Sequence, residues 1–153
     1  NNNKCKYHTM KYTCPLCELD PLCHSLKKIA DKQGIIYFYT CPSQAKMYYD
    51  TEGIVNHYQG VLSEIPADKE WVWIFDSVDF GLKHGMQFSV AKELSTLIGR
   101  YSTNLKQIII INPTFYTSIT YNMLMPFLSS KVVNIIEMNN ALHSGEEVVY
   151  GIL

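Results

Sequence analysis

Six cysteine and histidine side chains, the soft ligands that can hold a metal, lie within the first 24 residues of the chain. In sequence order they are Cys5, His8, Cys14, Cys17, Cys23 and His24. Thiolate and imidazole are ligands that Zn²⁺ prefers in closed tetrahedral sites, and a C-x2-H pair joined to a C-x2-C pair has the spacing such sites use. We therefore expect a structural Zn²⁺ site formed by Cys5, His8, Cys14 and Cys17.

The linker between these two pairs leaves the ligand set open. Only five residues separate His8 from Cys14, which is fewer than in common zinc fingers, so Cys23 or His24 could replace Cys5 or His8. Because residues 1–24 carry few aliphatic side chains, a metal would supply most of the free energy that orders them. Disulfides, a redox-active Cys-Pro-Leu-Cys motif and unligated thiols are the alternatives.

From about residue 25 the sequence alternates strand and helix signals. Runs of β-branched and aromatic residues predict strands at 34–40, 71–75, 106–112 and 132–138, and apolar residues at helical spacing predict helices at 44–62, 90–101 and 115–128. Ser43 is the expected cap of the first helix. Asn112-Pro113 should end the third strand, and Pro126 predicts a kink or a terminal turn in the last helix.

This alternation predicts an α/β fold in which a mostly parallel sheet of four or five strands is flanked by helices on both faces, with right-handed crossovers. A small metal-stapled segment should precede the sheet. We accordingly divide the chain into a Cys/His-rich segment, 1–24, and a sheet domain, 25–153. A chain of 153 residues can bury a sizeable single core.

Composition excludes several classes of protein. Hydrophobic residues make up 47% of the chain and charged residues 18%, yet no apolar run reaches the ~20 residues of a membrane helix, so a globular chain with no transmembrane segment is expected. We find neither a signal peptide nor a transit peptide and expect a cytoplasmic location. The net charge is −1, without the concentrated basic patch of a nucleic-acid binder, so no nucleic-acid partner is expected.

The sequence offers little support for catalysis. Parallel sheets bind ligands at the carboxyl ends of their strands, where Cys41, Asp76 and His84 could form a nucleophilic set. However, the residues after Cys41 lack the arginine of a phosphate-cradling loop, and no glycine-rich nucleotide loop occurs in the chain. We therefore expect a protein that is not an enzyme.

The order of elements, together with the stretch NLKQIIIINPTFYTSITYNMLMPFLSSKVVNIIEMN, resembles the CRAL-TRIO family over about residues 34–140. Asn104-Leu105-Lys106, Asn112-Pro113, Pro126-Phe127-Leu128 and Ser129-Ser130-Lys131 look most like the BCH branch of that family. The resemblance implies the family's sheet fold and a binding function. For the BCH branch it implies a protein-interaction scaffold, often around small GTPases.

Two departures from the family pattern shape the functional expectation. A short Cys-rich segment stands where the family has a helical lobe, and only 15 residues, Asn139 to Leu153, follow the last predicted strand. Less material is then left to enclose an acyl chain. We therefore expect a protein-protein interaction scaffold, with self-association as one option. The alternative is binding or transfer of a lipid or another apolar ligand, with peripheral membrane contact.

Overall fold

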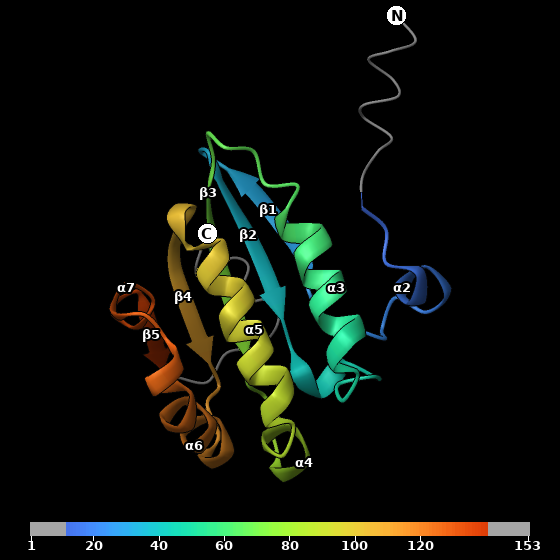
Figure 1. Cartoon of the computed structure of the whole chain (residues 1–153), viewed down its shortest axis with the longest axis vertical. Helices are drawn as coiled ribbons and strands as arrows, with labels where there is room; N and C mark the ends of the chain where they lie inside the picture. Colours follow the sequence, from blue (N-terminus) through green and yellow to red (C-terminus); the bar gives the residue numbers. More distant parts are fainter. Residues whose placement is uncertain (1–11, 141–153) are drawn as a thin grey trace, which may run out of the picture.

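A five-stranded sheet forms the centre of the protein. The computed structural model describes residues 12–140. The strands follow the order β1-β2-β3-β4-β5 across the sheet (Figure 1), with bounds β1 Lys27–Lys32, β2 Ile35–Thr40, β3 Glu70–Asp76, β4 Leu105–Ile111 and β5 Ile136–Asn139. β1 pairs with β2 antiparallel, and every other neighbouring pair is parallel. The predicted α/β class and mostly parallel sheet are confirmed.

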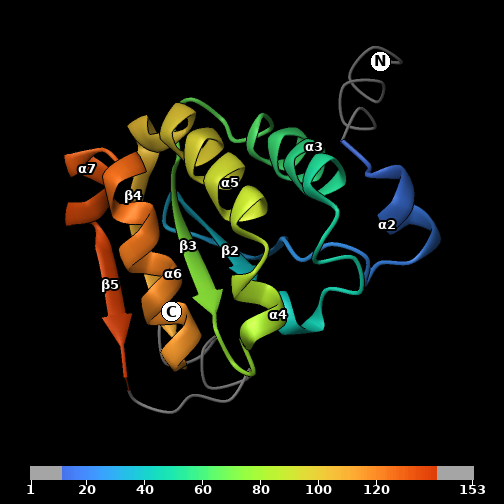
Figure 2. The same cartoon turned by 60° about the horizontal axis from the view of Figure 1, so that its bottom comes forward.

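The described helices of the sheet domain lie on one face of the sheet (Figure 2). The α-helices are α2 Pro15–Leu19, α3 Thr51–Leu62, α4 Leu82–Gly85, α5 Phe88–Arg100, α6 Phe115–Leu124 and α7 Ser130–Asn134; the 3-10 turns are η1 Pro42–Gln44, η2 Ser102–Asn104 and η3 Met125–Phe127. From β2 to β5 each crossover moves one strand in the same direction. Because crossovers are right-handed, all their helices fall on the same side. The expectation of helices on both faces was therefore wrong for the described residues.

The main core lies between these helices and the sheet. Trp71 and Trp73 of β3 pack there with Leu97 of α5, and Trp71 is 1% and Leu97 0% exposed. Both indole N–H groups have acceptors, because Trp71 Nε1 donates to the Tyr101 carbonyl and Trp73 Nε1 donates to Thr40 Oγ1. A second apolar cluster, on the other face, contains alternate residues of β2, β3 and β4.

The β1–β2 hairpin was not predicted as such. Its two-residue turn, Gln33-Gly34, has positive φ at both positions, as hairpin turns that match the strand twist require. β1 carries three lysines, Lys27, Lys28 and Lys32, and the residues at both of its ends are exposed. A charged edge strand of this kind resists pairing with other chains but gives no apolar signal in the sequence.

Helix α3 begins later than predicted. Its cap is Asp50, whose Oδ1 accepts from the Gly53 amide at 3.1 Å, and not Ser43. The amides of Lys46 and Met47 instead donate to the carbonyls of Leu22 and Cys23 in the N-terminal segment. These long-range backbone bonds take the donors that a helix starting at residue 44 would use, so residues 45–49 form no helix.

The C-terminal part of the sheet domain differs from the prediction in one respect. Pro126 lies in the 3-10 turn η3 that ends α6, as expected from its missing amide hydrogen. Residues 130–134, however, form helix α7 and not the start of a strand. Ser129 Oγ accepts from the Val132 amide, and Val132 is 2% exposed in the core, so cap and burial outweigh the strand preference of a β-branched residue.

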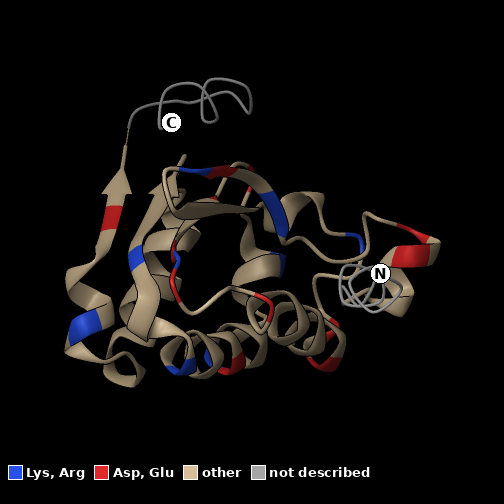
Figure 3. Cartoon of the chain, turned by 90° about the horizontal axis from the view of Figure 1, so that it is seen from above, with Lys and Arg blue, Asp and Glu red and all other residues tan. Residues whose placement is uncertain are grey.

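Lys and Arg residues alternate with Asp and Glu residues along the described ribbon, and neither sign is confined to one part of the fold (Figure 3). Several are paired across elements: Lys69 contacts Asp31 at 2.6 Å, and Lys46 contacts Asp20 at 2.6 Å. Among the helices of residues 12–140, none has the length and apolar character needed to cross a membrane.

Candidate functional site

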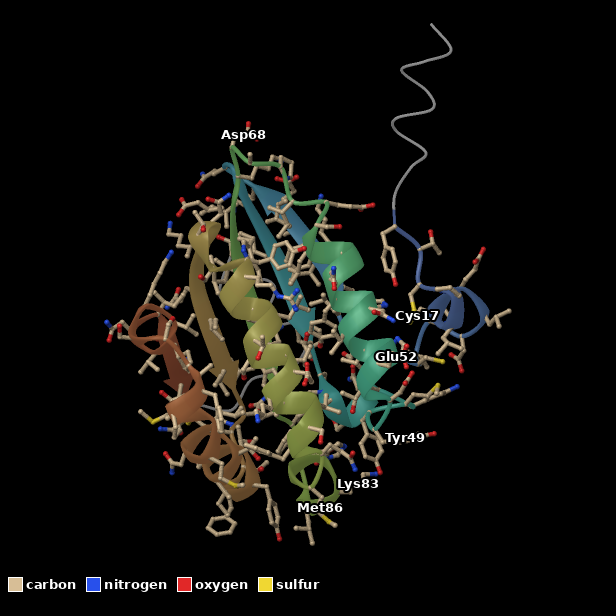
Figure 4. All side chains as sticks on the ribbon, viewed as in Figure 1. Cys17, Tyr49, Glu52, Asp68, Lys83 and Met86 are labelled. Carbon is tan, nitrogen blue, oxygen red and sulfur yellow. The ribbon has the colours of Figure 1, made fainter. Side chains whose placement is uncertain are left out.

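Four potential metal ligands meet where the N-terminal segment contacts α3. The ligand atoms of Cys14, Cys17, His24 and His57 all lie within 4.8 Å of one another, and we call these residues the Cys/His cluster. Cys14 directly precedes α2, Cys17 lies within α2, His24 precedes β1, and His57 lies on α3. Figure 4 shows Cys17 in the space between α2 and α3. The cluster thus joins three separate segments of the chain.

The two ring nitrogens of His24 have different partners. Its Nδ1 lies 3.5 Å from Cys14 Sγ and 3.7 Å from Cys17 Sγ, whereas its Nε2 lies 3.1 Å from Asp50 Oδ2. Because a carboxylate only accepts, Nε2 carries the hydrogen and Nδ1 presents its lone pair to the thiols. A tetrahedral zinc site has sulfur-to-nitrogen separations of roughly 3.5 Å, and carboxylates commonly orient zinc-binding histidines in this way.

His57 has a buried nitrogen without a partner. Its Nε2 donates to the Leu26 carbonyl at 3.1 Å, so Nδ1 carries a lone pair, and no described residue donates a hydrogen bond to that atom. Burial, opposed in part by the bond to Leu26, lowers the pKa of His57, which favours the neutral imidazole that metals require. An unpaired buried nitrogen is costly, and a cation coordinated there would satisfy it.

One face of α3 is shaped to receive the N-terminal segment. Gly53, His57 and Gly60 follow one another at helical spacing on that face. A Cβ at Gly53 would overlap the Asp50 carboxylate and lie 2.9 Å from His24 Nε2, and a Cβ at Gly60 would overlap the Tyr12 ring. The Tyr12 amide also donates to the Glu64 carboxylate. The two glycines therefore permit the close approach that brings His24 to His57.

The Cys17 thiol is protonated at neutral pH when no metal is bound. Burial is the largest cause of the raised pKa of Cys17, about 11, and the Cys14 thiol contributes in the same direction. A metal ion would have to displace this proton, as happens whenever thiolates coordinate zinc. Cys23 is buried nearby but does not belong to the four-residue cluster.

Some of the predicted metal ligands lie together in the structure. It brings Cys14 and Cys17 together with His24, which the sequence suggested as a substitute ligand. Cys5 and His8 lie outside the described residues. Sequence reasoning missed His57, because it lies 33 residues beyond His24 on the buried side of a helix, where a histidine looks like ordinary core. Only the fold places it beside the cluster.

An apolar cavity of about 160 Å³ lies between the sheet and helices α3 to α6. Its lining is Ser25, Thr40, Pro42, Ala45, Tyr48, Ile54, Tyr58, Trp73, Phe75, Phe80, His84, Gln87, Val90, Ala91, Leu94, Ser95, Thr120 and Leu124. A second cavity of about 120 Å³ lies next to it, beneath α6. The two share Phe75, Phe80, Ser95, Thr120 and Leu124 in their linings, so they adjoin.

Polar groups are present at a few places in the wall of the larger cavity. Tyr58 Oη lies 3.1 Å from Thr40 Oγ1, which also accepts from Trp73 Nε1. His84 Nδ1 accepts from the Gly81 amide at 2.9 Å, so Nε2 carries the hydrogen of this ring. Burial and then the charge of Lys83 lower the pKa of His84, which keeps the imidazole neutral.

The residues considered as a nucleophilic set have other partners. Cys41 Sγ lies 3.4 Å from Ser43 Oγ, and burial raises the pKa of the Cys41 thiol. Asp76 accepts from Tyr39 Oη at 2.5 Å and from Asn112 Nδ2 at 3.0 Å. No hydrogen bond within the described part of the chain joins Cys41, Asp76 and His84 to one another.

The sequence and the fold are both similar to those of known proteins. The model of the CRAL/TRIO domain matches residues 31–147, which is more than half of the chain. The structure is similar to the crystal structure of Sfh5, with a TM-score of 0.57 and 11% sequence identity, over 86% of this chain and 52% of that one, so the chain spans about half the length of Sfh5. No curated protein matches the sequence. The chain belongs to the CRAL/TRIO domain family.

Proposed function

We propose that this chain is a non-enzymatic binding domain that holds an apolar ligand between its sheet and helices α3 to α6. The observation that carries the proposal is the cavity of about 160 Å³, whose wall is formed largely by aromatic and aliphatic side chains. A dry apolar cavity of roughly this size can hold an aromatic ring or a short alkyl chain. Membership of the CRAL/TRIO family supports a ligand of lipid type.

The polar groups in the wall favour a ligand with one polar end. The protonated Nε2 of His84 is the donor that this ring has left to offer, because Nδ1 is engaged by Gly81. Gln87 and Thr120 also line the cavity. A single hydrogen-bond acceptor, such as a carboxyl or carbonyl group, would fix the orientation of a short-chain amphiphile while its apolar part contacts Trp73 and Leu94.

An exposed apolar surface over α4 and α6 supports uptake of such a ligand from a membrane surface. Phe115, Ile119 and Met123 recur at intervals of one helical turn on α6 and are 73%, 39% and 50% exposed. Met86, at the end of α4, is 70% exposed, and Figure 4 shows it beside Lys83 at the outer end of the molecule. A surface of this composition can enter a lipid interface beside the cavity wall.

Filling the cavity tests the binding proposal. Ala91 lines the cavity from α5, and Ala91→Leu should reduce the affinity for octanoate and toluene by about tenfold or more, since it occupies the ligand's space. The matched control is Ala67→Leu, the same change at an exposed loop position, which should leave both affinities unchanged. Calorimetric titration measures the affinities. Native mass spectrometry of gently purified protein should additionally show a bound apolar molecule.

A protein partner at the same apolar surface is the second candidate function. The exposure of Phe115 and Met123 also suits a protein-interaction scaffold of the BCH type, including self-association. The variant Phe115→Ser/Met123→Ser distinguishes the candidates. Loss of sedimentation with phosphatidylcholine vesicles would favour the membrane role, whereas a shift from dimer to monomer in analytical ultracentrifugation would favour the scaffold.

We also propose that the Cys/His cluster binds one structural Zn²⁺ ion through Cys14, Cys17, His24 and His57. The proposal is supported by the Cys₂His₂ donor set, the sulfur-to-nitrogen separations and the unpaired Nδ1 of His57. A reducing compartment such as the cytoplasm would keep the thiols available for the metal. In such a site the metal holds chain segments together and takes no part in a reaction.

Zinc content tests this assignment. Protein prepared without chelator should contain one equivalent of zinc by elemental analysis, and Cys14→Ser/Cys17→Ser should contain almost none. Cys41→Ser, a change at a buried cysteine outside the cluster, is the matched control and should retain the metal. Absence of zinc from the unmodified chain, together with no uptake when zinc is added, would exclude the site.

A further inference from the structure

We infer that the metal in the Cys/His cluster controls the apolar cavity, because the cluster holds together two of the cavity's walls. The inference rests on the proposed function and names a regulation of the same site. Its physical content is a coupling free energy: zinc should strengthen ligand binding, and the ligand should strengthen zinc binding by the same factor.

The first wall is the segment that follows the cluster along the chain. His24 belongs to the cluster, and the next residue, Ser25, lines the cavity. Ser25 is fixed on two sides, because its carbonyl accepts from Tyr58 Oη at 2.6 Å and its Oγ accepts from the Cys41 amide at 2.8 Å. The carbonyl of Leu26 accepts from His57 Nε2. His24 before this wall and His57 beside it therefore connect the wall to the cluster, in addition to the bonds from Tyr58 and Cys41.

The second wall is helix α3. His57 belongs to the cluster, while Ile54 and Tyr58 on the same helix line the cavity. The Tyr58 hydroxyl also lies 3.1 Å from Thr40 Oγ1, at the end of β2, and Thr40 accepts from Trp73. A metal bound by both His24 and His57 would thus cross-link the Ser25 wall to the Tyr58 wall, one residue away from the cavity on each side.

Removing the metal should loosen this connection. Without a cation, Nδ1 of His57 has no partner among the described residues, and no covalent or coordinate bond holds segment 12–24 against α3. The Ser25 wall is then held to α3 by hydrogen bonds alone, such as that from Tyr58 Oη to the Ser25 carbonyl, and transient opening of these bonds costs the ligand part of its enclosure. Couplings between two binding sites are typically 5–150-fold in affinity, and we expect at least about fivefold weaker ligand binding in the metal-free chain.

The test measures octanoate affinity as a function of free zinc. The full chain is made metal-free with a chelator and titrated calorimetrically with octanoate before and after Zn²⁺ is restored. Asp50→Asn provides a graded variant, because asparagine can still cap α3 but no longer offers a carboxylate to His24 Nε2. Loss of such a partner typically weakens metal binding about 10–100-fold. The variant should reach the wild-type octanoate affinity only at correspondingly higher free zinc.

Glu52→Gln is the matched control, since it removes an exposed carboxylate two residues from Asp50, whereas the carboxylate paired with His24 is that of Asp50. It should leave the zinc dependence unchanged. Equal octanoate affinity in the zinc-loaded and metal-free chains, both folded by circular dichroism, would overturn the coupling and leave the proposed ligand site intact. No octanoate binding in either form would overturn the proposed function and the coupling with it.

Discussion

The N-terminal segment and the sheet domain are stabilised by different kinds of buried side chain. Between residues 12 and 24 the buried side chains are Cys14, Cys23 and His24, all of them sulfur or nitrogen donors, and α2 buries none of its own residues. The sheet domain instead buries tryptophan, leucine and isoleucine in a continuous core. A segment without an apolar core needs another source of free energy, so its order should depend on the cluster, whereas the sheet should not.

Removing the metal with a chelator tests most directly whether the two regions differ in what stabilises them, and we expect this treatment to have the largest effect. Structural zinc sites have apparent binding free energies of about 10–16 kcal/mol. Removing the metal should abolish hydrogen-exchange protection in α2, where the amides of Glu18 and Asp20 donate to Cys14 and Leu16, while β3 and β4 keep theirs. Mass spectrometry of exchanged peptides makes the measurement. Uniform loss of protection in both regions would show that they fold as one unit.

Truncating one leucine in each region tests whether apolar burial stabilises the sheet domain and not the N-terminal segment. Leu97 of α5 is 0% exposed and Leu19 of α2 is 86% exposed. Leu97→Ala should lower the free energy of unfolding by about 2–5 kcal/mol because it leaves a cavity in the core, whereas Leu19→Ala should change it by less than about 0.5 kcal/mol. Urea denaturation followed by circular dichroism gives both values. Similar losses in the two variants would contradict the assigned burial.

The sequence predicted the parts of the fold that depend on local patterns. β3 and β4 are continuous apolar runs, and α5 has an apolar stripe, so each appeared at nearly its observed position. The start of α3 was missed because the amides of Lys46 and Met47 bond to residues far away in the sequence. His57 was missed for a similar reason. Its role as a candidate ligand depends on the packing of α3 against α2, which spacing along the chain does not encode.

Substituting one glycine in a helix of the sheet domain and one beside the Cys/His cluster should change stability in opposite directions. Gly99 of α5 has no described atom within 4 Å of an added Cβ, so Gly99→Ala should stabilise the protein by about 0.5–1 kcal/mol. Gly53 of α3 faces Asp50 and His24. Gly53→Ala should therefore destabilise by about 1–3 kcal/mol through loss of the charge-assisted bond between these side chains, and should also weaken zinc binding. Thermal melting and zinc titration report the two effects, and stabilisation in both variants would refute the close approach at Gly53.

A buried histidine of the sheet domain provides the smallest expected effect. The pKa of His84 is lowered, first by burial and then by Lys83, from an ordinary value of 6.5. Below about pH 6.5 the unfolded chain takes up a proton at this position that the folded chain does not, so stability should fall as the pH drops from 6.5 toward the lowered value. His84→Asn keeps an acceptor for the Gly81 amide and removes the titration, so the melting temperature of this variant should fall less than that of the unmodified protein between about pH 7 and about pH 5.

Because His84 lies outside the Cys/His cluster, the difference between the two proteins should persist in the presence of a chelator. A difference that disappears without zinc would instead tie the stability of this part of the sheet domain to the metal.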